Sequence, residues 1–218
     1  AGMFEGMLEF LPERAVLLRE LASVAYPLSD SFLANTLAST PVRVVLPWVF
    51  VSISYFMVDA QPCAESYFPL AALVVLSTLV GSSIGTCVGC CTEDYHVAAS
   101  LTTVLSLSML IVGGFYLTAL PQWLSFLGYC SAFRYAYRSC VQVMFDYAGR
   151  VKCAGGYWIA ACATSSTGYV DNSEVISFVL GDEVEPLASN IWIMAIFFVF
   201  FRVLAYWALL ILEKKILF

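Results

Sequence analysis

Four long apolar stretches cover most of this 218-residue chain and limit what it can fold into. The last of them, residues 189–212, holds a single charged residue, Arg202, among aromatic and aliphatic side chains. A run of about 18 or more apolar residues can cross the roughly 30 Å hydrocarbon layer of a membrane as a helix. Hydrophobic residues make up 61% of the chain and charged residues 12%, which leaves little for the polar faces of a soluble fold. We therefore predict an all-α, polytopic membrane protein.

The hydropathy pattern predicts one membrane domain with modest loops. Pro41 and Pro47 fall inside the first span, where we expect kinks that neighbouring helices tolerate. A tight turn is expected between the second and third spans. The predicted transmembrane helices are residues 29–59, 67–91, 96–116 and 189–212.

Residues 1–28 are too charged to span a membrane, although apolar residues recur in them at helical spacing. We predict a helix that lies at the membrane surface. Its charged residues are candidates for coupling to another domain: Glu13, Arg14, Arg19 and Glu20.

The segment 117–188 differs from the spans. Its first part is aromatic-rich but interrupted by Arg134 and Arg138, which predicts helices that dip into the interface, as in a re-entrant turn. Its second part is polar and holds Cys153 and Cys162, for which a disulfide is the preferred interpretation and unpaired thiols the alternative. Basic residues near both chain ends predict cytosolic termini and an external 117–188 loop, although the arginines of that loop oppose the rule.

Arg43 is the sharpest local signal, because it lies inside the first predicted span. A charged side chain at such depth costs at least ~2.5 kcal/mol on insertion scales, so a function usually accounts for it. The alternative is that Arg43 lies near the end of the span and snorkels to the headgroups. The sequence favours neither interpretation over the other.

Two patterns on the second and third spans concern packing and solute binding. Gly81, Gly85 and Gly89 fall on one helix face, which predicts close approach of another helix. Thr103, flanked by other hydroxyl residues at helical spacing, gives a weakly polar face near Leu107 that could line a cavity for an amphipathic solute. Hydroxyls bonded back to their own helix are the commoner alternative.

No chemistry of catalysis, metal binding or nucleotide binding emerges. Cys87, Cys90 and Cys91 lack the second ligand pair of a zinc site, so packing at a helix end or palmitoylation is preferred. No carboxylate pair, nucleophile–base pair or GxxxxGK[ST] loop is present, so no cofactor is expected in this chain. The net charge of −6 argues against a nucleic-acid partner.

Several segments in order resemble the White-type, or G-subfamily, ABC transporters. Residues 12–20 look like the connecting helix of that family, and residues 31–37 with Pro41 look like the start of its third membrane helix. Residues 113–116, followed by 120–124 and 129–135, are similar to the end of the fifth helix and the re-entrant turn after it.

The resemblance implies that the four spans are helices three to six of a six-helix ABC-2 type domain. The first two helices and a nucleotide-binding domain, with its ATP and Mg²⁺, are expected outside this sequence, so the chain would be a fragment or an incomplete gene product. Such proteins work as homo- or heterodimers in a plasma or internal membrane and move lipids, sterols or amphipathic small molecules.

The resemblance also implies roles for particular residues. Thr103, Leu107 and Leu110 match cavity-facing positions. Arg43 matches an arginine that alters substrate choice, so it is taken with them as a candidate residue of the substrate cavity. Phe115 and Tyr116 match an apolar plug, or gate, between cavity and exit. Cys153 matches a loop-disulfide position, with Cys162 as a partner at shorter spacing than in the family.

A scaffold of the tetraspanin type is the alternative function, because it too has four spans and a large cysteine-containing second outer loop. Against it, the loop has no Cys-Cys-Gly, and tetraspanins do not need a charged helix before the first span. An intramembrane enzyme lacks any convergent catalytic group. Transport is therefore the preferred prediction.

Overall fold

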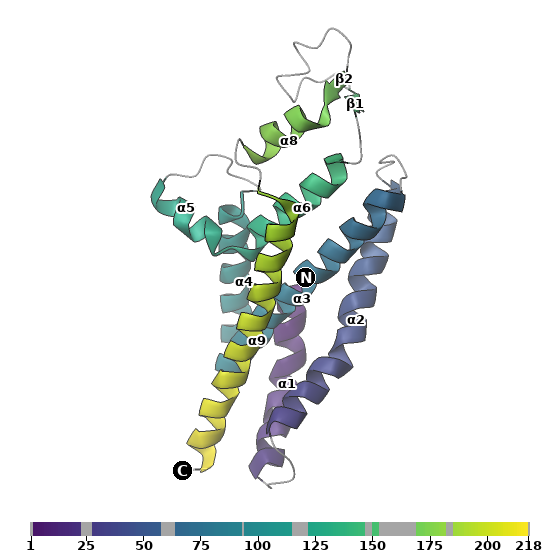
Figure 1. The fold of residues 1–218 in the computed structure, drawn as a ribbon. Helices are drawn as coiled ribbons and strands as arrows, with labels where there is room; N and C mark the ends of the chain where they lie inside the picture. Colours follow the sequence, from purple (N-terminus) through teal and green to yellow (C-terminus); the bar gives the residue numbers. More distant parts are fainter. Residues whose placement is uncertain are drawn as a thin grey trace.

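The computed structural model describes residues 2–22, 28–57, 64–92, 94–114, 122–146, 150–152, 169–181 and 185–217. Four long helices form a bundle with α1 beside them, and the shorter elements gather at one end (Figure 1). In chain order the elements are α1 (Gly2–Ala22), α2 (Leu28–Met57), α3 (Ala64–Cys91), α4 (Tyr95–Val112), α5 (Gln122–Tyr129), α6 (Ala132–Asp146), β1 (Arg150–Lys152), β2 (Tyr169–Asp171), α8 (Asn172–Leu180) and α9 (Leu187–Leu217).

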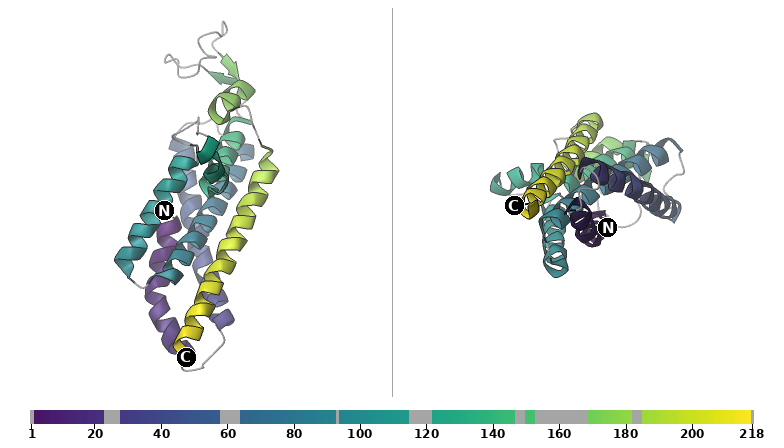
Figure 2. Two further views of the ribbon diagram at one scale, coloured as in Figure 1. Left: turned by 90° about the vertical axis from the view of Figure 1, so that its left-hand side faces the viewer. Right: turned by 90° about the horizontal axis from the view of Figure 1, so that it is seen from below.

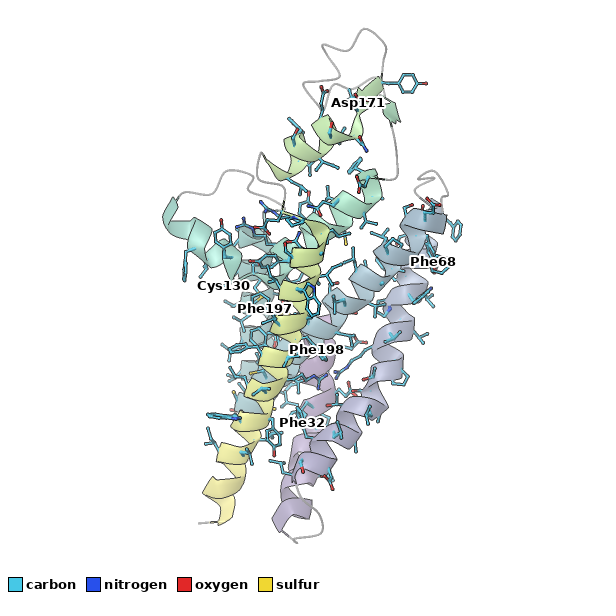
Figure 3. The ribbon with its side chains drawn as sticks, viewed as in Figure 1. Phe32, Phe68, Cys130, Asp171, Phe197 and Phe198 are labelled. Carbon is cyan, nitrogen blue, oxygen red and sulfur yellow. The ribbon has the colours of Figure 1, made fainter. Side chains whose placement is uncertain are left out.

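Four helices of the described part are long and apolar enough to cross a membrane, as the sequence predicts: Leu28–Met57, Glu65–Cys91, Tyr95–Val112 and Leu187–Leu212. Successive spans run in opposite directions. We call the end of the bundle with α5, α6 and α8 the cap end, and the end with the short α3–α4 link the turn end. Apolar side chains cover the outward faces of α2, α4 and α9 (Figure 3), as expected of surfaces that face lipid or a partner.

The third span is shorter than predicted. It ends at Val112, not at residue 116, and Gly113 caps it with its N–H bonded to the Met109 carbonyl. Gly114 follows with φ of +87°, a left-handed backbone that favours glycine and cannot continue the helix. The predicted span ran through this glycine pair, which was interpreted as a bend at its outer end, whereas the glycines end the helix.

The predicted surface position of the N-terminal helix is wrong for its first half. Met3, Met7 and Phe10 of α1 are buried, and α1 contacts α2, α3, α4 and α9. Figure 2 shows α1 running beside the spans along the turn-end half of the bundle. The residues that the sequence reasoning weighed, such as Glu13 and Arg14, lie in the second half, whereas the earlier residues are mostly apolar. The helix starts at Gly2, so Pro12 lies in its interior.

The glycine face of α3 is the surface on which α1 packs, and this confirms the predicted packing role. A Cβ on Gly85 would collide with the Met3 backbone carbonyl, and one on Gly6 with that of Ser82. A Cβ on Gly2 would come within 2.7 Å of the Thr78 carbonyl oxygen. Small residues on both helices thus let the two parallel backbones come into contact. Helices inside a membrane associate through close packing of this kind, because the hydrophobic effect does not drive them together there.

Two buried apolar clusters hold the bundle together. The cluster toward the cap end joins α1, α3, α6 and α9 through Met3, Val80, Ile84, Ala132, Tyr135 and Met194. The cluster toward the turn end joins α1, α2, α3 and α9 through Phe10, Leu28, Cys87, Cys90, Ala205 and Leu209. Cys87 and Cys90 therefore pack at a helix end, as predicted. Phe201 of α9 packs against both clusters.

The cap end is tied to the spans by hydrogen bonds. Ser131 Oγ, just before α6, donates to the Met109 carbonyl at 2.8 Å. Gln142 Nε2 of α6 donates to the Glu185 carbonyl at 2.7 Å, and Arg138 lies 3.8 Å from the Glu185 carboxylate. β1 and β2 pair antiparallel, with Lys152 opposite Tyr169. These two short strands depart from the all-α prediction, because three residues are too few to show an alternating pattern.

Candidate functional site

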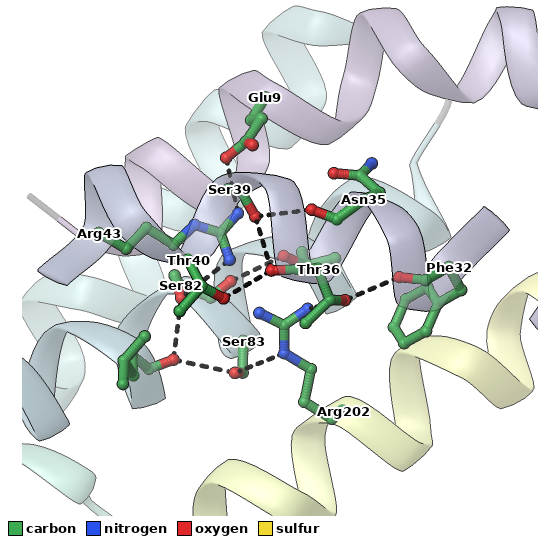
Figure 4. Close-up of polar contacts among 12 residues, drawn as sticks. Glu9, Phe32, Asn35, Thr36, Ser39, Thr40, Arg43, Ser82, Ser83 and Arg202 are labelled. Atoms are coloured by element: carbon green, nitrogen blue, oxygen red, sulfur yellow. Dashed lines mark hydrogen bonds and ion pairs between the residues drawn. The ribbon is translucent and has the colours of Figure 1, made fainter. Parts of the chain in front are cut away.

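A cluster of charged and hydroxyl side chains lies in the middle of the helix bundle (Figure 4). We call it the polar cluster and define it as Glu9, Thr36, Arg43, Ser82, Ser83 and Arg202. Arg43 lies near the middle of the first span and Arg202 near the middle of the last. These are the depths at which a charge in a membrane protein costs most.

Arg43 links three helices. Its Nη2 donates to Glu9 Oε2 of α1 at 2.7 Å, an ion pair, and its Nη1 donates to Ser82 Oγ of α3 at 3.2 Å. Only 4% of Arg43 is exposed, so the snorkelling alternative is wrong. A buried guanidinium is stable only when its charge and N–H groups are satisfied, and Glu9 supplies the charge.

Arg202 brings in the last span. Its Nε donates to Ser83 Oγ of α3 at 3.1 Å, and its Nη1 donates to Thr36 Oγ1 of α2 at 3.0 Å. Its guanidinium carbon lies 5.6 Å from the centre of the Phe198 ring, within the range of a cation–π contact. Among the described residues, the hydrogen-bond partners of Arg202 are thus neutral, whereas Arg43 is paired with the Glu9 carboxylate.

The serines can accept these bonds because their own hydrogens are used elsewhere. Ser82 and Ser83 both donate to the Leu79 carbonyl at 2.9 Å, within α3. Thr36 donates in the same way to the Phe32 carbonyl at 2.8 Å. Back-bonding of this kind is common for hydroxyls in helices, and it leaves oxygen lone pairs turned toward the two guanidiniums.

Two cavities adjoin this core. The polar cluster surrounds one of about 10 Å³, lined by Glu9, Phe10, Phe32, Asn35, Thr36, Ser39, Arg43, Thr86 and Arg202. A larger one of about 230 Å³ lies toward the cap end, between the start of α1 and helices α3, α4, α6 and α9. Its lining is mainly apolar, with hydroxyls from Ser77, Thr78 and Ser106.

The structure does not bring the four predicted cavity residues together. Arg43 is interior, whereas Thr103 and Leu107 are exposed on α4 and Leu110 is partly exposed. Thr103 donates to the Ala99 carbonyl at 2.7 Å, so its hydrogen is used within the helix, which is the commoner alternative. Leu107 is 53% exposed and faces away from the protomer.

Other predicted residues fall outside the described part. The backbone of α1 reaches Ala22, but the side chains of Glu13, Arg14, Arg19 and Glu20 are not described. Phe115, Tyr116, Cys153 and Cys162 lie outside the described ranges altogether. The coupling, gate and disulfide assignments therefore stay predictions.

Metal binding by the described cysteines is not favoured, and neither is a reactive thiolate at Cys140. Among the described residues, no group of three or more His, Cys, Asp or Glu could hold a metal ion. Burial raises the pKa of the Cys140 thiol in α6 to about 11, so little of it is the reactive thiolate at neutral pH. Cys91 and Cys130 are exposed.

Most of the polar cluster was not predicted from the sequence. Arg202 was noted only as the single charge of the last span, and no role was predicted for Glu9, Ser82 or Ser83. One feature of the sequence pointed to Glu9. It lies in the mostly apolar first half of α1, where Glu5 is the other charged residue. The other members of the polar cluster lie far apart in the sequence, so no local pattern links them.

Closely packed spans around a charged core define the membrane domain of a polytopic protein. A family model described as "ABC-2 type transporter" matches residues 1–145. The chain belongs to the ABC-2 type transporter family.

Relatives confirm the resemblance to G-subfamily and White-type proteins. ABC transporter G family member 21 of Arabidopsis thaliana is 28% identical over 207 residues, which cover 95% of this chain and 29% of that protein. Protein white of Drosophila melanogaster is 30% identical over 210 residues, covering 94% of this chain and 29% of that protein. ABC transporter ATP-binding protein/permease wht-1 of Caenorhabditis elegans is 30% identical over 129 residues, 58% of this chain and 19% of that protein. The chain thus spans less than a third of the length of each of these relatives.

Proposed function

We propose that this chain is the transmembrane part of an ATP-driven G-subfamily transporter that moves lipid, sterol or amphipathic small molecules across a membrane. The match of residues 1–145 to the ABC-2 type transporter model carries the proposal. The name of one relative, an ATP-binding protein/permease, supports ATP as the energy source. The same match favours a transporter over the tetraspanin-like scaffold.

ATP and Mg²⁺ would bind to a nucleotide-binding domain, on the same or another polypeptide, because this sequence has no P-loop. Two membrane domains would associate as a homo- or heterodimer in a plasma or internal membrane, with both termini cytosolic. The exposed apolar face of α4 supports a cavity between two copies, lined by Thr103, Leu107 and Leu110. Arg43, being interior, would act on helix arrangement and not by touching the solute. A Cys153–Cys162 disulfide would close the external loop, which non-reducing peptide mapping tests.

The coupling element would be α1. Its first half is held to α3 by the glycine contacts and to α2 by the Glu9–Arg43 ion pair, and its second half carries Glu13, Arg14, Arg19 and Glu20 toward the turn end. A push on the second half would therefore reach both α2 and α3. Moving a two-state equilibrium from 1:99 to 99:1 needs about 5.5 kcal/mol, which ATP binding would supply.

Replacing Glu20 by alanine in the full-length transporter is expected to separate ATP turnover from transport. The charge lies at the far end of the proposed lever, so hydrolysis should continue while flux falls several-fold. ATP turnover and substrate flux are measured on one purified preparation, with Glu174→Ala in the exposed part of α8 as the control. Wild-type values of both quantities in Glu20→Ala would contradict the lever. Loss of flux in both variants would contradict the assignment to Glu20.

We propose that Phe115 and Tyr116 form the apolar gate, just after the Gly113–Gly114 helix stop. The turn frees the backbone there, and two aromatic rings can close a narrow passage by packing edge to face. Residues of the interfacial aromatic belt are the alternative.

Alanine at both gate positions is expected to raise basal ATP turnover and to broaden the range of amphipathic solutes transported. A belt residue should instead affect only the amount of protein. Phe126→Ala in α5, which removes an aromatic side chain that is 73% exposed, is the matched control. Transport of several solutes, normalised to surface protein, distinguishes the two, and an unchanged solute profile in the double variant would exclude the gate.

A further inference from the structure

We propose that the polar cluster binds one small monovalent anion, chloride, between Arg43 and Arg202. The site would be a fixed structural component of the membrane domain. It is distinct from the solute path on α4, and it does not depend on transport activity.

The charge balance of the cluster is the first observation. The cavity-lining side chains that the structure describes include two guanidiniums and one carboxylate, which leaves one positive charge in excess. Glu9 contacts Arg43 at 2.7 Å, whereas the hydrogen bonds of Arg202 go to the hydroxyls of Ser83 and Thr36. An uncompensated charge near the middle of a span is costly, and bound counter-ions are one way to remove that cost.

An unused donor is the second observation, independent of the charge count. Arg43 Nε is buried and has no hydrogen-bond partner among the described residues, although Arg43 is 4% exposed and lines the cavity. A buried N–H without an acceptor costs about 1–3 kcal/mol, and more when it is charged. An acceptor placed in the cavity would satisfy this donor.

The size of the cavity limits what can fill it. About 10 Å³ is roughly the space for one water-sized particle. Chloride is a single atom but is clearly larger than a water molecule, so the cavity must widen to hold it, and the partly exposed Arg202 side chain can adjust to allow this. A carboxylate-bearing solute or a lipid phosphate is larger still.

The donors that line the cavity select an anion over a cation. Thr36, Ser39 and Thr86 donate their hydroxyl hydrogens to carbonyls of their own helices. Apart from the Asn35 amide, which also lines the cavity, the remaining side-chain donors therefore belong to the two guanidiniums, each of which has five N–H groups. Each arginine uses two of these groups in hydrogen bonds to described residues. Water is the competing occupant, since it could accept from Arg43 and donate to the hydroxyl oxygens.

Thermal unfolding of the purified full-length protein tests the site, in nanodiscs of zwitterionic lipid without ATP or solute. Chloride is varied against gluconate at constant ionic strength. A ligand that binds only the folded state raises Tm with the logarithm of its concentration above Kd. We expect such a rise for the wild-type protein, also with bromide.

Two substitutions that change the net charge of the polar cluster in opposite directions test whether the cluster is the chloride site. Arg202→Gln should abolish the chloride response, because the excess charge is gone. Glu9→Gln should move its onset to about tenfold lower chloride, because the excess charge is larger, and tenfold corresponds to about 1.4 kcal/mol. Arg134→Gln removes a guanidinium in α6, outside the cluster, and should leave the response unchanged.

A wild-type Tm that does not depend on chloride at constant ionic strength would overturn the proposal and favour water as the occupant. An Arg202→Gln response equal to that of wild type would overturn it as well. If Arg202→Gln does not fold, the wild-type curve and the Glu9→Gln shift still decide. Because no step of the test involves ATP or solute, its failure says nothing against transport, and failure of transport says nothing against the anion.

Discussion

Replacing Gly85 by alanine is expected to destabilise the helix bundle by about 3 kcal/mol, the upper end of the usual cost of overpacking. The added methyl group would collide with the Met3 backbone carbonyl. Backbone cannot rotate away as a side chain can, so α1 must move off α3. The Tm of the purified protein, followed by size-exclusion chromatography after heating, should fall clearly, and Gly6→Ala should behave alike because it collides with the Ser82 carbonyl.

The control for this prediction lies one helical turn away. At Gly81 the nearest atoms to an added Cβ are Met3 Cγ and the Met3 backbone nitrogen, both at 3.5 Å, which is ordinary van der Waals contact. Alanine is a better helix former than glycine by about 1 kcal/mol, so Gly81→Ala should leave Tm unchanged or raise it. If Gly81→Ala lowers Tm as much as Gly85→Ala does, the close α1–α3 packing is not the cause. Gly6→Ala and Gly85→Ala together should cost less than their sum, since they disrupt one interface.

Removing Glu9 is expected to cost more than removing its partner. Glu9→Ala leaves the Arg43 guanidinium, with a side chain 5% exposed, without a counter-charge, and breaking a buried pair in this way costs about 3–5 kcal/mol. Arg43→Met leaves a carboxylate that is 32% exposed and keeps apolar volume in the core, so its cost should be less than half as large. The double variant should be more stable than Glu9→Ala alone.

Unfolding midpoints of the two single variants and the double variant, all at one chloride concentration, check this order. Glu5→Ala on the same helix is the control, because no ion pair joins Glu5 to another described residue. Simple addition of the two single costs in the double variant would show that Glu9 and Arg43 do not interact. A double variant less stable than Glu9→Ala would show that other contacts of Arg43 stabilise the bundle more than its ion pair with Glu9 does.

Local patterns in the sequence were sufficient for the spans and for the α3 glycine face. Apolar length predicts a membrane helix because the bilayer core has a fixed thickness, and glycines four residues apart must share a helix face. The partner of that face was not predictable in the same way. Gly2 and Gly6 repeat the spacing on α1, but the charges of its second half dominated the interpretation of the whole helix and led to a surface position.

The polar cluster could be predicted only in part, for a related reason. Arg43 is conspicuous because its neighbours in the chain are apolar. Its partner Glu9 is 34 positions away, and Thr36 and Arg202 are 166 positions apart. Such pairs are set by how helices cross, which periodicity within one helix does not contain. The family resemblance, in turn, assigned Arg43 to the solute cavity, whereas the fold places it in the interior of the protomer.

The two arginines form hydrogen bonds to neighbouring serines on the same turn of α3. Ser82 holds Arg43, Ser83 holds Arg202, and both hydroxyls donate to the same carbonyl, that of Leu79. One turn of α3 thus fixes the height of α2 and of α9 along the bundle. If that turn rotates or shifts during a working cycle, the two serines pass the displacement to α2 and α9 together, so we expect these helices to move with α3 and not independently of each other.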